Sequence, residues 1–260
     1  MITQKYVIVF DLDETIGNFS QIYRLWCLIK DYLNNQDLNK KYLFSLFDIC
    51  PEIFRRDIFK LFKFIKSKKY KKICHKVMIF TNNSGPNNWV TLIQEYIHKK
   101  LNYPLFDQII RAFKVNGKQI ELCRSSYDKT YTDFINCTKL PSNTEICFID
   151  DIHHKKMEHN NVVYINVKPY YHIFDYETIT NKFYNNNKKL FNNNYISFKK
   201  YILDSTYYDD YTCYQNKTII EKNIEYLITQ KLIKEVREFL LYNKKYTVKK
   251  KIYNNKTRKN

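Results

Sequence analysis

The sequence is poor in small residues. It has three glycines, five prolines and a single alanine, Ala112, in 260 positions, whereas lysine, asparagine, isoleucine, tyrosine and phenylalanine are abundant. We interpret this bias as the codon usage of an AT-rich genome and not as a functional signal. Asparagine and tyrosine stand where other proteins have alanine, glycine or serine. Residue propensities therefore carry less weight here than the spacing of apolar residues.

The sequence also lacks long apolar runs and C-x-x-C pairs. No stretch approaches the roughly 18 apolar residues of a membrane-spanning helix. The first apolar run, residues 6–10, is too short for a leader peptide and is followed at once by acidic residues. The seven cysteines are an odd number, which favours reduced thiols. We therefore expect an intracellular, cytoplasmic protein without a membrane span.

Acidic residues are too few to balance the basic ones. The formal net charge is +18, which favours acidic partners such as nucleic acid, a phosphoprotein or an anionic surface. Residues 244–260 contain eight basic residues and no acid, and we expect a disordered basic tail that contacts nucleic acid or another polyanion. The alternative is that the lysines, too, only reflect codon usage.

Four short apolar runs predict buried parallel strands, since each is rich in β-branched residues. They cover residues 6–10, 77–80, 145–149 and 162–167. A further short strand is expected within 105–113, before a turn at 115–118. Apolar residues at helical spacing follow from about residues 21, 51, 89 and 127. Strands that alternate with helices predict an α/β fold with a doubly wound, Rossmann-like parallel sheet.

The predicted α/β domain covers residues 1–175. About 30 residues, near 20–49, are left for a small helical cap insertion. Residues 176–243 are expected to form a helical C-terminal extension, in which 219–242 has the pattern of an amphipathic helix. Asparagine clusters around residues 185–194 favour a loop or linker there.

Polar residues follow three of the predicted strands directly. Asp11 and Asp13 follow the first, and the second and third end in the pairs Thr81-Asn82 and Asp150-Asp151. In a parallel sheet, ligands bind beyond the carboxyl ends of the strands. If these strands are neighbours, all six side chains meet in one site, which Lys129 could also reach.

This set of side chains suits phosphoryl transfer. Clustered carboxylates repel one another unless a cation lies among them, and Mg²⁺ prefers oxygen ligands. Asp11 could attack phosphorus as a nucleophile and Asp13 could serve as the acid and base. Thr81 would bind phosphoryl oxygens, Lys129 would supply positive charge, and Asp150 would complete the metal site.

Each of these residues has a structural alternative. Asp11 and Asp13 could be solvated turn carboxylates, Thr81-Asn82 a strand-ending turn, and Asp150-Asp151 the start of a helix. Lys114, Lys118 and Lys139 compete with Lys129. We expect His153 and His154 not to bind metal, and we expect Trp26 and Trp89 to lie in the core.

The pattern Asp11-x-Asp13-x-Thr15 after an apolar strand resembles the first motif of the HAD superfamily. Thr81, Lys129 and Asp150-Asp151 resemble its other three motifs. The wording Phe-Asp-Leu-Asp-Glu-Thr-Ile is similar to the NLI-interacting-factor-like phosphatases, which act on phosphorylated polymerase tails, and residues 150–170 resemble HAD-like proteins of large DNA viruses. The resemblance covers about residues 5–170.

The resemblance implies a HAD-type, Mg²⁺-dependent hydrolase, and the likeness to proteins of large DNA viruses suggests viral origin and action in a host cell. It assigns Asp11, Asp13 and Lys129 to catalysis. It assigns Thr81, Asn82 and Thr15 to substrate binding. The metal ligands would be Asp11, Asp13, Asp150 and Asp151.

A small cap would leave the site open to large substrates. We therefore expect a phosphorylated macromolecule, with a phosphoprotein favoured. Two alternatives stay open: a nucleotide or nucleic-acid end phosphatase, and a non-catalytic scaffold whose C-terminal region binds polyanions.

Overall fold

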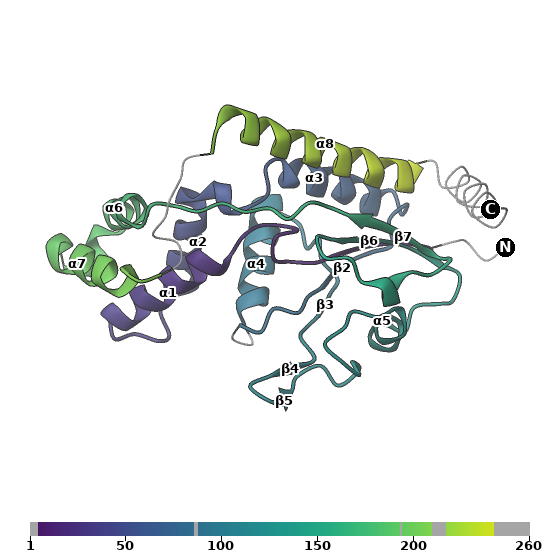
Figure 1. The fold of residues 1–260 in the computed structure, drawn as a ribbon, viewed down its shortest axis with the longest axis horizontal. Coiled ribbons are helices and arrows are strands. Elements are labelled where there is room, and N and C mark those ends of the chain that lie inside the picture. Colours follow the sequence, from purple (N-terminus) through teal and green to yellow (C-terminus); the bar gives the residue numbers. More distant parts are fainter. Residues whose placement is uncertain (1–4, 86–87, 193, 210–216, 242–260) are drawn as a thin grey trace.

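A five-stranded parallel sheet forms the centre of the computed structural model, which describes residues 5–85, 88–192, 194–209 and 217–241 (Figure 1). The strand order is β3-β2-β1-β6-β7. The strands are β1 (Lys5–Phe10), β2 (Lys76–Phe80), β3 (Gln108–Ile110), β6 (Thr144–Asp150) and β7 (Val162–Asn166). The predicted α/β fold with a parallel sheet is confirmed, and the three strands that end in polar residues are neighbours.

Side chains of alternate residues enter two separate cores, because successive residues of a strand point to opposite faces. In β1, Val7 and Val9 belong to a core that contains Phe134 of α5 (Tyr131–Thr138). Ile8 and Phe10 belong to a larger core on the other face. Both faces of the sheet are thus covered, which explains why its strands are apolar throughout rather than alternating.

Helices on the larger core come from both ends of the chain. They are α1 (Ser20–Tyr32), α2 (Lys40–Ile49), the 3₁₀ helix η1 (Pro51–Ile53), α3 (Ile58–Tyr70), α4 (Trp89–Leu101), α6 (Tyr176–Asn186), η3 (Lys188–Phe191), α7 (Tyr195–Thr206) and α8 (Ile219–Leu241). A further 3₁₀ turn, η2 (Lys155–Met157), precedes β7, and the predicted turn at 115–118 joins the hairpin strands β4 (Lys114–Val115) and β5 (Lys118–Gln119). Trp26 and Trp89 are buried, as predicted.

Two helix predictions had wrong boundaries. The stretch expected to be helical from residue 51 is broken before α3, where Asp57 adopts a left-handed conformation with φ 63°. The helix expected from residue 127 begins only at Tyr131, because Thr130 caps it by accepting a hydrogen bond from the Asp133 amide. Lys129 consequently lies in a loop and not on the helix.

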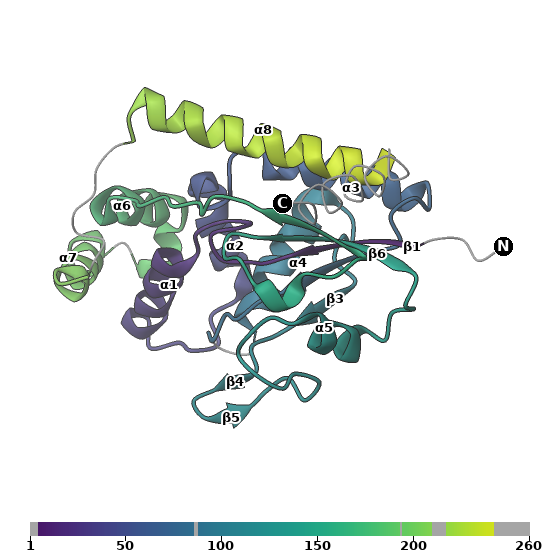
Figure 2. The same cartoon turned by 45° about the vertical axis from the view of Figure 1, so that its right-hand side comes forward.

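The asparagine-rich segment around residues 185–194 was wrongly predicted to be a loop or linker. Asn187 donates hydrogen bonds to the Phe183 carbonyl and to Ser45 of α2, and Asn194 caps α7 by accepting from the Ser197 amide. These asparagines satisfy helix ends. α6 and α7 pack against α2 and α1, so the predicted insertion and part of the predicted C-terminal extension form one helical lobe beside the sheet (Figure 2).

The predicted C-terminal amphipathic helix is confirmed as α8, which packs along α3 and β7 (Figures 1 and 2). Its buried apolar side chains, such as Leu232, Val236 and Phe239, lie in the C-terminal half. Ile220 and Leu227, expected on the same face, are 71% and 64% exposed. The predicted basic tail, 244–260, lies outside the described residues. No helix in the described part of the chain is long and apolar enough to cross a membrane.

The expectation that all cysteines are reduced is wrong for one pair. Cys123 and Cys137 form a disulfide, because the loop after the β4–β5 hairpin returns to α5 and brings their Cα atoms to 5.0 Å. The disulfide closes the loop that carries Lys129. Four other cysteines have free thiols, and Cys213 lies outside the described residues.

Candidate active site

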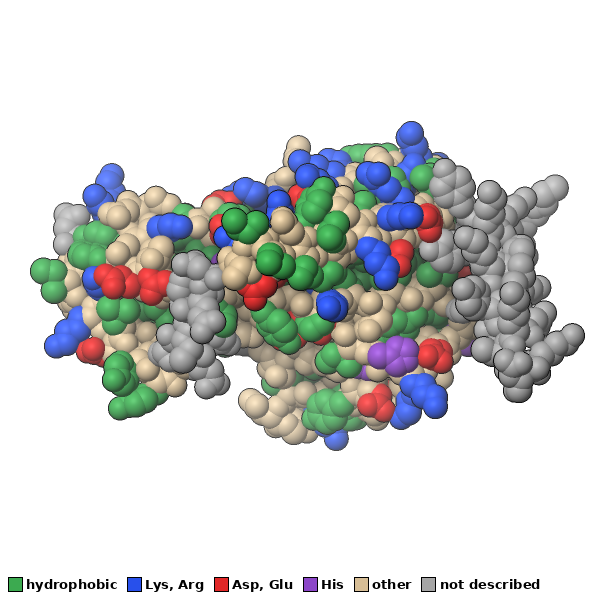
Figure 3. Space-filling view, turned by 45° about the horizontal axis from the view of Figure 1, so that its top comes forward, with side chains coloured by type: hydrophobic (Ala, Val, Ile, Leu, Met, Phe, Trp, Pro, Cys, Tyr) green, Lys and Arg blue, Asp and Glu red, His purple; other side chains and the backbone are tan. Residues whose placement is uncertain are grey.

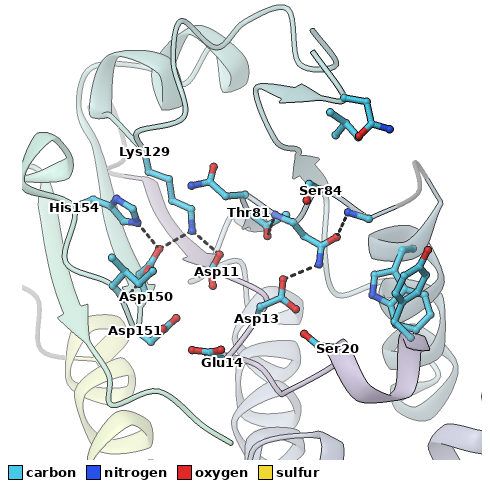
Figure 4. Close-up of a pocket in the computed structure, with 18 residues that line it drawn as sticks. Asp11, Asp13, Glu14, Ser20, Thr81, Ser84, Lys129, Asp150, Asp151 and His154 are labelled. Carbon is cyan, nitrogen blue, oxygen red and sulfur yellow. Dashed lines mark hydrogen bonds and ion pairs between the residues drawn. The ribbon is translucent and has the colours of Figure 1, made fainter. Parts of the chain in front are cut away.

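The site lies where the chain changes direction across the sheet. From β1 the chain leads to β2 on one side, and it returns through α5 to β6 on the other side of β1. The connections of adjacent strands therefore leave in opposite directions, which opens a crevice at the carboxyl ends of the strands. A cavity of about 800 Å³ occupies this position, and Asp11, Thr81, Lys129 and Asp150 all line it (Figure 4).

Lys129 lies at the centre of the charges. Its Nζ is 2.5 Å from Asp11 Oδ1 and 2.7 Å from Asp150 Oδ2, and its side chain is 3% exposed. Asp11 follows β1 and Asp150 is the last residue of β6, and these two strands pair with each other, so one ammonium group can contact both carboxylates. Of the four lysines considered from the sequence, Lys129 is the one that lines the cavity.

Three carboxylates could hold a metal ion. One oxygen each from Asp11, Asp150 and Asp151 lies within 4.8 Å of the others. Burial raises the pKa of Asp11 to about 7, although the adjacent Lys129 acts in the opposite direction, and burial also raises the pKa of Asp151. A divalent cation would offset this cost of burial and repulsion, and the all-oxygen donor set fits a hard cation.

Asp13 lies outside this group of three. Its Oδ2 accepts a hydrogen bond of 2.8 Å from the side-chain nitrogen Nδ2 of Asn83. Burial raises the pKa of Asp13, and the bond from Asn83 lowers it. The structure thus places the Asp13 carboxylate at the cavity but does not bring it together with the other three predicted metal ligands.

Thr15, predicted to bind substrate, lies behind the wall of the cavity. It is fully buried, does not line the cavity, and exchanges two hydrogen bonds with Asp151: its Oγ1 donates to Oδ1 at 2.9 Å and accepts from the amide at 3.0 Å. Thr15 therefore orients Asp151, which lies 136 residues further along the chain.

The two predicted substrate-binding residues after β2 do line the cavity. Thr81 is buried and its Oγ1 accepts a hydrogen bond from the Asn83 amide at 2.9 Å. Asn82 is exposed, and its amide nitrogen donates to the Tyr127 carbonyl at 3.0 Å. Asn82 therefore links β2 to the loop that carries Lys129.

The histidines next to Asp150-Asp151 differ from each other. His153 is exposed and pairs with Glu158. His154 lines the cavity with its Nε2 3.5 Å from Asp150 Oδ2, and burial lowers its pKa. Neither belongs to the group of three carboxylates that could hold a metal.

Two buried arginines were not recognised from the sequence. Arg124 donates to the carbonyls of Thr81, Arg111 and Tyr127, and so fixes the Lys129 loop against the end of β2. Arg55 donates to the carbonyls of Thr15, Glu14 and Lys168, and so fixes the turn after Asp13. Neither role could be predicted from the sequence, because partners such as the Thr81 and Lys168 carbonyls come near only in the folded chain.

No protein-family model, curated protein or solved structure matches this chain. Proposals on its function therefore depend on the geometry of the site.

Proposed function

We propose that this protein is a HAD-type, Mg²⁺-dependent phosphoric monoester hydrolase that acts through an aspartyl-phosphate at Asp11. The observation that carries the proposal is the contact of Lys129 with both Asp11 and Asp150, beside Asp151, at the ends of adjacent parallel strands. One carboxylate is enough to balance the charge of one lysine. Three carboxylates around one buried lysine leave negative charge that suits a cation and a transferred phosphoryl group.

In the proposed first step, an oxygen of Asp11 attacks phosphorus and the bond from phosphorus to the ester oxygen breaks. Asp13 gives its proton to the leaving oxygen, a role that fits its raised pKa. Lys129 keeps Asp11 oriented by holding Oδ1, and Thr81, which lines the same cavity, would bind a phosphoryl oxygen.

In the proposed second step, Asp13 removes a proton from water, and the water oxygen attacks phosphorus. The bond between phosphorus and Asp11 breaks, which restores the carboxylate and releases inorganic phosphate. Asp11, Asp150 and Asp151 would hold Mg²⁺, which neutralises charge on the phosphoryl oxygens when it is bound. Thr15 keeps Asp151 in place for that task.

The favoured substrate is a phosphoprotein. The cavity volume of about 800 Å³ exceeds the space a phosphate group needs, and among the described residues of the helical lobe only Ser20 and Tyr23 of α1 line it. A protein segment could therefore reach Asp11 without displacing the lobe.

The test is hydrolysis of p-nitrophenyl phosphate with Mg²⁺ and with EDTA. We expect activity in the wild type with Mg²⁺ alone, and Asp11→Asn should lose it by about 10³-fold or more. Asp204→Asn makes the same chemical change at an exposed position of α7 and should retain activity. Acid quenching of the wild type during turnover should trap phosphate on Asp11. A wild type without Mg²⁺-dependent hydrolysis would refute the proposal.

A further inference from the structure

The cavity is strongly acidic for a site that would bind an anion. Five carboxylates line it: Asp11, Asp13, Glu14, Asp150 and Asp151. Among the described residues of the lining, Lys129 is the one cationic side chain, and two of these carboxylates already pair with it. One divalent cation would balance part of the remaining negative charge, and this cation and Lys129 together would attract the phosphate of a monoester. No cationic side chain of the described lining is left for a second phosphate.

The acids do not surround the cavity evenly. Figure 4 shows Asp150 and Asp151 on one side of Asp11, and Asp13, Thr81 and Ser84 on the other. The uncharged part of the lining includes Ser20 at the start of α1 and Tyr23 one turn later, together with Trp89 at the start of α4. The leaving group of a substrate would therefore contact uncharged side chains, two of which carry aromatic rings.

Tyr23 is the aromatic residue that a ligand can reach. Its ring is partly exposed and packs on Trp89, with centroids 4.9 Å apart and planes at 59°. Trp89 is only 2% exposed and also contacts Phe47 of α2, so it is fixed in the core behind Tyr23. Tyr23 and Trp89 also line a neighbouring cavity of about 360 Å³, so the aromatic pair separates two spaces.

We propose that Tyr23, held by Trp89, packs against an aromatic ring in the leaving group, and that the substrate carries a single phosphate. Phosphotyrosine and nucleoside monophosphates share this chemistry, whereas phosphoserine lacks the ring and a nucleic-acid end carries further phosphates. Aromatic contacts add specificity to a site whose charges bind only one phosphate. This inference rests on the proposed hydrolase function.

The test compares the ratio of two kcat/KM values, for matched phosphotyrosine and phosphoserine peptides with Mg²⁺. The ratio in the wild type is not itself the readout, because aryl esters are intrinsically more reactive. We expect Tyr23→Leu to lower the ratio at least about fivefold, mainly through KM, and Tyr23→Phe to retain it. Both substrates are measured on one preparation, so a loss of folded protein does not change the ratio.

Tyr70→Leu is the matched control. Tyr70 packs on Tyr103 with the same centroid distance of 4.9 Å, but it is 64% exposed on α3 and does not line the cavity. The ratio should stay at the wild-type value in this variant.

A second comparison tests the charge argument. A nucleoside 3′,5′-bisphosphate should be hydrolysed with a kcat/KM at least about tenfold below that of the 5′-monophosphate, because its second phosphate meets no cation. An unchanged peptide ratio in Tyr23→Leu, or equal use of both nucleotides, would overturn the inference. If the wild type hydrolysed none of the esters, phosphoserine included, the proposed function itself would fail.

Discussion

Two opposite requirements act on the ionisation of Asp11. As a nucleophile it must be ionised, yet burial raises its pKa to about 7. A bound divalent cation resolves the conflict, because it favours the carboxylate form. In the metal-free protein the conflict should appear as a loss of stability with rising pH.

The stability of the metal-free protein should therefore depend on pH through Asp11. The folded-state pKa lies above the ordinary value of 3.8, so the contribution of Asp11 is fully present below that value and is lost as pH rises towards 7. The loss is at most about 4 kcal/mol, since one pKa unit corresponds to about 1.4 kcal/mol. Between pH 4 and 8, the free energy of unfolding in EDTA should fall more steeply for the wild type than for Asp11→Asn.

Denaturant titrations at several pH values measure this difference. Titrating groups remote from Asp11, such as His172, are present in both proteins and cancel in the comparison. Added Mg²⁺ should restore stability to the wild type at pH 8 but much less to Asp11→Asn. Equal slopes for the two proteins in EDTA would contradict the assigned pKa.

Single residues differed in how far the sequence could reveal them. Asp11 and Asp150 follow buried strands directly, so local order in the chain was sufficient to place them at one edge of the sheet. Thr15 also lies just after a buried strand, which indicated that it is near the site. Its hydrogen bonds to Asp151 could not be predicted in this way, because they join segments far apart in the sequence. Asn83 and Arg124 were missed for the same reason: they act through partners that only the folded chain brings near.

Helices could be predicted from the sequence wherever apolar residues recurred at helical spacing, and strands wherever short apolar runs occurred. α8 follows such a period over its full length, but burial differs between its two halves. Figure 3 shows hydrophobic side chains exposed among basic ones on the side of the molecule where α8 lies. Periodicity predicts which face of a helix is apolar. It does not predict how much of that face finds a partner, because this depends on where α3 and β7 end.

Two leucines of α8 test this difference. Leu232 is 1% exposed and Leu227 is 64% exposed. We expect Leu232→Ala to lower the free energy of unfolding by about 2–5 kcal/mol through lost burial and a cavity. Leu227→Ala should change it by no more than about 0.5 kcal/mol. Urea unfolding of both variants gives the comparison, and equal effects would mean that the N-terminal half of α8 is covered in solution.

At the scale of the whole molecule, the net charge of +18 contrasts with the acidic cavity. The two can serve different steps, since a positive surface attracts an acidic macromolecule and the cavity selects the group that reacts. The sequence revealed the total charge and predicted that the acids meet in one site within reach of Lys129 if their strands are neighbours. The order of the strands fulfils that condition.

The basic segment 244–260 tests the role of the surface charge. Its deletion removes eight basic residues and leaves a net charge of +10. We expect the full chain to bind a DNA duplex with an affinity that falls as salt rises, because each neutralised phosphate releases a counterion and contributes about −0.9 to the slope of log K against log salt. Deletion should weaken binding at low salt and reduce the slope by several of these increments.

Hydrolysis of p-nitrophenyl phosphate is the internal control for this deletion, because every residue assigned to the proposed reaction, from Asp11 to Asp151, precedes this segment in the chain. The truncated chain should keep the rate of the full chain while it loses affinity for DNA. If affinity and slope are both unchanged, the lysines of this segment reflect codon usage, and attraction of an acidic partner must come from the basic residues of the folded part. If the rate falls together with affinity, the segment contributes to the site or to the fold, and surface charge and catalysis are not separate functions of this chain.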